Sequence, residues 1–198
     1  MIGCVMAGAL THIIIRNDLE HEHRVGGFVI SSIKGLVADG PDPKLKEKLM
    51  LFGQFVGDWD ILEARYPQPD GTEIKRRGEI HFRWVLDGKA VQDVWMTHEE
   101  NPPHVVPVGT TIRFYDPKID AWQSIWIAPM HGLVQTFLAR KVGDEIVLEG
   151  KSKDGYPERW IFSEIRPDSF RWKSVESHDN EKTWQLTEEM RVQRNRNR

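Results

Sequence analysis

The sequence predicts a mainly β protein, an antiparallel up-and-down barrel of about ten strands with one N-terminal capping helix. From Trp59 onward, polar and apolar residues alternate with the period of two that is typical of strands. Short turn signals, such as Asp87-Gly88 and Gly143-Asp144, separate the runs. Links of hairpin length leave no room for crossover helices, and a long meander avoids exposed edges by closing into a barrel.

The chain is expected to consist of two parts. Residues 1–40 show no sustained period, so we expect an N-terminal extension there. Residues 41–198 are expected to form a single barrel domain, because strand and turn signals continue without a break in composition. The chain is long enough for one barrel with a sizeable core.

A capping helix is predicted over residues 43–56. Asp42 is a good N-cap, and Pro43 follows it at the first helical position, where proline is tolerated. Gly57 is expected to end the helix, since glycine readily adopts a left-handed conformation. The apolar residues that recur at helical spacing, and should face the barrel, are Leu45, Leu49, Phe52 and Val56.

The turn signals set the boundaries of the predicted strands. These strands cover residues 59–66, 73–86, 89–98, 109–116, 121–128, 132–141, 145–151, 157–165, 169–177 and 183–193. The longest break, residues 101–108, contains Pro102, Pro103 and Pro107. Because proline cannot extend a ladder, we expect a rigid surface loop there that overhangs the barrel mouth.

Composition excludes several classes of function. A formal charge of -3 offers no attraction to nucleic acid or to an acidic membrane. No apolar run approaches the roughly 18 to 20 residues of a membrane-spanning helix, and the first residues lack the basic region of a signal peptide. The single cysteine, Cys4, excludes an internal disulfide. We therefore expect a cytoplasmic protein that contacts neither nucleic acid nor membrane.

Eight tryptophans are the unusual feature of the composition. Such a large side chain with one donor fills a core or lines a site. Strand alternation places aromatic and polar residues on the same inward faces, as in a ligand cavity, so a small apolar or aromatic ligand is the expected partner. The residues expected to bind it are Trp84, Trp95, Arg113, Trp126, Trp172 and Glu176. The alternative is a filled interior whose polar groups bond to one another.

A second hypothesis is a cofactor-free enzyme of the isomerase, cyclase or dehydratase type. A carboxyl group in an apolar barrel has the raised pKa that acid or base chemistry uses. The candidates are Glu176, His131 and Glu188, and the two glutamates lie on tryptophan-bearing faces of adjacent predicted strands. Alternatively, these groups form structural ion pairs, with partners such as Arg113, Arg159 and Lys173.

Three segments resemble the DUF1579 group of calycin-like proteins. They are Phe52–Ile61, Trp122–Trp126 after Phe114-Tyr115-Asp116, and Glu176–Asp179 leading into Lys182-Thr183-Trp184. The resemblance implies a barrel like those of lipocalins and fatty-acid-binding proteins over residues 45–194, and it implies no activity. Residues 178–181 depart from the group, in which a glycine-containing turn is common at this place.

No metal or cofactor is expected. His21-Glu22-His23 lacks a partnered third ligand. Gly57-Asp58-Trp59 resembles the opening of the nitrobindin group, a similar barrel that implies haem. A haem barrel needs an axial ligand, and the last predicted strand contains no histidine. A third alternative is an interaction module in which the N-terminal extension mediates a homodimer.

Overall fold

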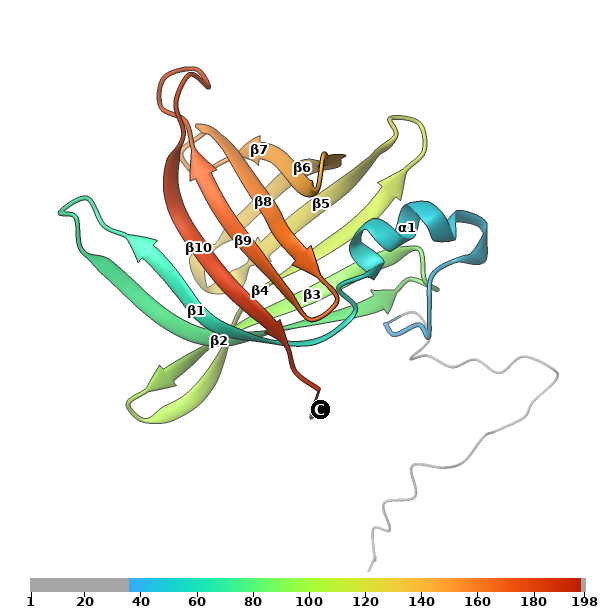
Figure 1. Ribbon diagram of the computed structural model, residues 1–198, viewed down its shortest axis with the longest axis horizontal. Coiled ribbons are helices and arrows are strands. Elements are labelled where there is room, and N and C mark those ends of the chain that lie inside the picture. Colours follow the sequence, from blue (N-terminus) through green and yellow to red (C-terminus); the bar gives the residue numbers. More distant parts are fainter. Residues whose placement is uncertain (1–35, 197–198) are drawn as a thin grey trace, which may run out of the picture. The chain divides into compact units, whose positions relative to one another are not determined.

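The computed structural model describes residues 36–196. Ten antiparallel strands follow one another around a closed barrel, which β1 completes by pairing with both β2 and β10 (Figure 1). The strands are β1 (Gly57–Pro67), β2 (Glu73–Val85), β3 (Ala90–Glu100), β4 (Pro103–Asp116), β5 (Ala121–Ala128), β6 (Leu133–Val142), β7 (Glu145–Lys151), β8 (Pro157–Arg166), β9 (Ser169–Glu176) and β10 (Gln185–Arg194). The predicted fold class is therefore confirmed.

The helical segment is shorter than the predicted span of residues 43–56. It begins with the 3-10 turn η1 (Pro43–Leu45), where the Asp42 carboxylate accepts a hydrogen bond of 2.9 Å from the Lys44 backbone N–H. The α-helix α1 (Lys46–Gly53) follows directly. The predicted N-cap is thus correct, while the first turn is tighter than an α-helix.

The end of the helix was predicted wrongly at Gly57. That residue opens β1 with a φ of 134°, and a Cβ there would lie 2.4 Å from a nitrogen of Arg194. The Arg194 guanidinium, which comes from β10, donates bonds of 2.9 Å to the carbonyls of Val56 and Gln54. Carbonyls after a helix need such partners, and the last strand supplies them here.

Helix α1 lies beside one end of the barrel (Figure 1). Aromatic side chains of α1 and of the turn that follows it pack into this end. Phe52 and Phe55 are 0% and 1% exposed. The Phe52 ring meets Trp122 edge-on with centroids 5.0 Å apart, and the Phe55 ring lies 4.9 Å from that of Phe170. Burying two phenylalanines in this way contributes about 1.5–3 kcal/mol each.

Only residues 101–102 of the expected proline-rich loop over residues 101–108 form a turn, and the rest of it is part of a strand. β4 begins at Pro103, and its pairing with β3 runs from Pro103 opposite Glu100 to Pro107 opposite Met96. Pairing of β4 with β5 starts only at Thr110. The proline-bearing half of β4 therefore has an unpaired side, and an edge strand tolerates residues that cannot donate there.

Within residues 36–196, no helix combines the length and apolarity needed to cross a membrane. The expected extension over residues 1–40 lies mostly outside the described part of the chain, and His21-Glu22-His23 and Cys4 lie wholly outside it.

Candidate functional site

A cavity of about 220 Å³ lies inside the barrel. Its floor includes Phe82 and Phe162, the same rings that pack against Phe55 of the helical segment, with centroids 5.7 and 5.1 Å from it. The helix thus fills one part of the interior and the cavity occupies another. The other lining residues are Ile80, Asp93, Trp95, Thr111, Arg113, Trp126, Gln135, Glu158, Trp160, Trp172, Ser174, Thr187, Glu188 and Met190.

Four tryptophans form a continuous wall of this cavity. Successive ring centroids are 5.9 Å apart from Trp95 to Trp126, 6.1 Å from Trp126 to Trp160, and 5.4 Å from Trp160 to Trp172. These spacings are typical of interacting aromatic rings. The strands β3, β5, β8 and β9 each contribute one of these rings, which we call the indole wall.

Glu158 is the most fully bonded carboxylate of the site. Its Oε1 accepts bonds of 2.7 Å from Trp160 Nε1 and 2.8 Å from Ser174 Oγ. Its Oε2 accepts a bond of 2.7 Å from Gln135 Nε2. The residue is 7% exposed, and three donors on three strands hold its head group at the cavity wall.

Glu188 stands opposite Ser174 on the neighbouring strand β10. Its Oε1 is buried without a hydrogen-bond partner among the described residues. Burial is the main cause that raises the pKa of Glu188 to about 8; a hydrogen bond from the Tyr66 hydroxyl opposes this rise, and the Glu158 carboxylate adds to it. The carboxyl group is therefore mainly protonated at neutral pH.

Arg113 is the cation of the cavity wall. Its guanidinium forms a buried ion pair with Asp93 on β3 and lies 5.1 Å from the Phe52 ring centroid. Its Nε has no hydrogen-bond partner in the described part of the chain. Because the charge is already matched by Asp93, the guanidinium adds little net positive potential to the cavity.

The structure brings together five of the residues that sequence reasoning selected. Those that line the cavity are Trp95, Arg113, Trp126, Trp172 and Glu188. Three others lie elsewhere. Trp84 reaches under α1, where its ring would meet a Cβ on Gly53 at 2.4 Å. His131 is exposed in the 3-10 turn η2 (Pro129–His131).

Glu176 also lies outside the cavity lining. It stands opposite Glu158 at the end of β9, and its Oε2 lies 3.3 Å from His178 Nε2. Burial raises its pKa, and the Glu158 carboxylate adds to this effect. Glu176 and Glu188 lie on the adjacent strands β9 and β10 but do not stand opposite one another, because Glu188 stands opposite Ser174 and Glu176 opposite Gln185.

Sequence reasoning missed Glu158, Trp160 and Asp93. The first two could have been found from strand alternation. Glu158, Trp160 and Phe162 occupy every second position of the predicted strand 157–165, so they lie on the same face. Asp93 shares a face with Trp95 in the same way. Alternation along a strand shows which side chains point inward, but it does not show how far along the barrel axis each one lies.

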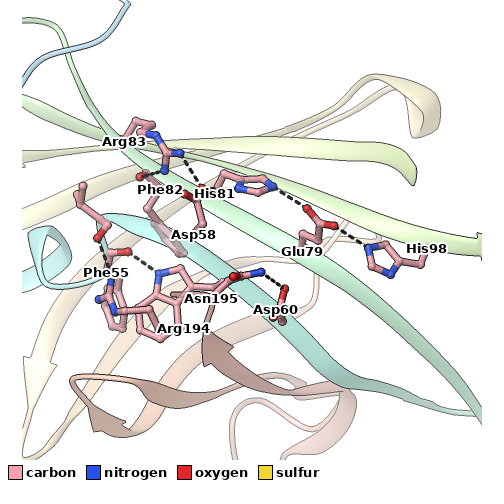
Figure 2. Close-up of polar contacts among 12 residues, drawn as sticks. Phe55, Asp58, Asp60, Glu79, His81, Phe82, Arg83, His98, Arg194 and Asn195 are labelled. Atoms are coloured by element: carbon pink, nitrogen blue, oxygen red, sulfur yellow. Dashed lines mark hydrogen bonds and ion pairs between the residues drawn. The ribbon is translucent and has the colours of Figure 1, made fainter. Parts of the chain in front are cut away.

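A separate polar cluster covers the outer face of β1, β2 and β3 (Figure 2). His81 Nδ1 lies 2.6 Å from Asp58 Oδ1, and its Nε2 lies 3.0 Å from Glu79 Oε2. His98 Nε2 lies 3.0 Å from Glu79 Oε1. Burial alone would raise the pKa of Asp58, but hydrogen bonds from His81 and Arg83 outweigh it, so that pKa is lowered. Along each strand these residues alternate with residues whose side chains point into the barrel, and they do not line the cavity.

No group of three histidine, cysteine, aspartate or glutamate residues suited to a metal ion is present among residues 36–196.

Comparison with known proteins shows the fold. No family model matches the sequence, and no curated protein matches it. Among solved structures, Rv2717c from M. tuberculosis is similar with a TM-score of 0.51 at 12% identity, over 79% of this chain and 99% of that one. The S-type phycobiliprotein lyase CPES from Guillardia theta is similar with a TM-score of 0.51 at 13% identity, over 75% of this chain and 93% of that one. The chain therefore has a calycin-like barrel fold.

Proposed function

We propose that this protein binds a small, largely aromatic molecule in its barrel cavity. The observation that carries the proposal is the indole wall, which faces a space of about 220 Å³ together with a few polar groups. An apolar pocket with a small number of placed polar groups is the usual composition of a ligand site.

The volume limits the size of the ligand. Pockets for drug-sized ligands measure roughly 300–1,000 Å³. We therefore infer a ligand with one ring and a short polar substituent, stacked on the indole wall.

Similar barrels give this proposal limited support. The lyase CPES is named as acting on phycobiliproteins, and at 13% identity its likeness concerns the fold alone. Membership of the DUF1579 group and a single barrel domain over residues 41–198 remain predictions. The homodimer also remains a prediction, because it depends on an extension that lies mostly outside the described residues.

Native mass spectrometry of the purified full chain tests the binding function. We expect an added small-molecule mass that disappears on denaturation, or uptake of small aromatic compounds by the apo protein. Trp172→Ala should reduce this binding at least tenfold, because Trp172 belongs to the indole wall.

Trp184→Ala is the matched control. Trp184 lies outside the cavity lining, under the Arg159 guanidinium at 4.1 Å from the ring centroid. The control variant should bind as the wild type does. A wild-type chain that carries no ligand and takes up none of the aromatic compounds would contradict the proposal.

A cofactor-free enzyme is the second candidate. It is favoured by the two carboxyl groups of the cavity, since Glu158 is held by three donors while Glu188 has a pKa of about 8. Carboxyl groups in such different environments can serve as base and acid. For any reaction found by screening, Glu188→Gln should abolish turnover while ligand binding persists. Turnover that survives this change would remove the assignment.

A further inference from the structure

The cavity holds more carboxyl groups than cations. Its charged lining residues are Asp93, Arg113, Glu158 and Glu188. Arg113 is already paired with Asp93, so neither glutamate has a cationic partner in the cavity lining. Uncompensated carboxyl groups in an apolar interior are costly unless a positive charge reaches them.

The two glutamates lie close enough to influence one another. Ser174 stands between them in the sheet, opposite Trp160 on β8 and opposite Glu188 on β10. Ser174 donates its hydroxyl hydrogen to Glu158, leaving the buried Oε1 of Glu188 without a donor. An N–H donor from a ligand would satisfy that oxygen.

The aromatic part of the site favours the same kind of ligand. The faces of tryptophan rings attract cations, and the interaction strengthens when the cation is removed from water. The indole wall and the two glutamates border the same cavity. An anion would instead meet two carboxyl groups, and the neutralised Arg113–Asp93 pair offers it little compensation.

We propose that the cavity is selective for a small organic cation, a primary or secondary amine on an apolar or aromatic frame, whose ammonium group donates hydrogen bonds to Glu188 and Glu158. The frame stacks on the indole wall. This inference rests on the ligand-binding function proposed above and specifies the chemistry of its ligand.

Binding of the cation is coupled to proton release. The groups that face Glu188 are Tyr66 from β1 and Glu158 from β8, with Arg76 acting on Tyr66. Burial keeps Glu188 mainly protonated at pH 7 in the free protein. An ammonium ion beside it favours the carboxylate, so binding releases up to about one proton and affinity rises with pH towards about 8.

The test uses three probes that share a ring and differ in charge: phenethylammonium, 2-phenylethanol and phenylacetate. Calorimetric titration of the full chain should give the tightest binding for phenethylammonium, at least tenfold over 2-phenylethanol, and the weakest for phenylacetate. Titration in two buffers of different ionisation enthalpy should show protons released with the amine alone.

Variants separate the charge effect from folding. Glu188→Gln should remove the proton release and most of the preference for the amine, while binding of 2-phenylethanol stays within about threefold. Glu158→Gln should also weaken binding of the amine. Glu189→Gln is the matched control, since Glu189 lies on the opposite face of β10, pairs with Arg65 and Arg171, and undergoes the same chemical substitution outside the cavity.

Each outcome decides between the two proposals. If the neutral or anionic probe binds as tightly as the amine, and Trp172→Ala weakens it, the cavity function stands and the cation selectivity is wrong. If Glu188→Gln and Glu189→Gln change amine binding equally, the glutamate assignment is overturned. If none of the probes binds, both proposals fail.

Discussion

Arg113 and Asp93 form an ion pair inside the barrel, with side chains that are 3% and 6% exposed. Removing one member leaves a buried charge without its partner, so we expect Asp93→Ala to lower the free energy of unfolding by about 3–5 kcal/mol. The double variant Asp93→Leu with Arg113→Met should lower the free energy of unfolding much less, because it removes both charges. Urea denaturation measures the free energy of unfolding of both variants. Equal losses for the single and the double variant would contradict a buried ion pair between Asp93 and Arg113.

Phe52 anchors the capping helix, so truncation of its side chain should destabilise the whole barrel. The side chain is 0% exposed and contacts Trp122 and Phe162, with ring centroids 5.0 and 5.9 Å away. We expect Phe52→Ala to lower the free energy of unfolding by about 3–5 kcal/mol.

Met50 provides the control on the same helix. Its side chain is 39% exposed, and Met50→Ala should change the free energy of unfolding by less than about 0.5 kcal/mol. Thermal or urea unfolding checks both variants. Similar losses for the two residues would show that α1 does not fill the barrel end as described.

Glu188 should make the folded protein less stable as pH rises. Its pKa is raised from 4.5 to about 8 on folding. Between these values the unfolded chain ionises while the folded chain keeps its proton, so stability falls by up to about 1.4 kcal/mol per pH unit and levels off above about pH 8. Glu188→Gln should lose this pH dependence, so the stability of the variant relative to the wild type should rise from pH 5 to pH 8. A constant difference would contradict the raised pKa.

The fold could be predicted from the sequence because its signals are local. Alternation and turn residues determine the strands, and nine of the ten begin within two residues of the predicted positions. β4 is the exception, since the tolerance of Pro103 and Pro107 depends on β5 ending at Ala128 and leaving one side unpaired. Where β5 ends cannot be read from the residues of β4, so the local sequence pattern of β4 did not predict its first half.

The candidate site could be predicted only in part, because depth along the barrel depends on register. Alternation correctly selects Trp95, Trp126 and Trp172 as inward residues. It cannot show that Trp84 lies beneath α1, or that Glu176 stands beyond the cavity while its cross-strand partner Glu158 lines it. The register irregularity between Leu186 and Glu188 shifts the pairing further.

The most direct test of the account is to observe the indole N–H signals of the eight tryptophans by NMR during titration with phenethylammonium and 2-phenylethanol. After assignment by single substitutions, the signals of Trp95, Trp126, Trp160 and Trp172 should shift with at least one of these probes, and that of Trp184 should stay in place. Shifts confined to Trp184, or none at all, would contradict ligand binding in the barrel cavity.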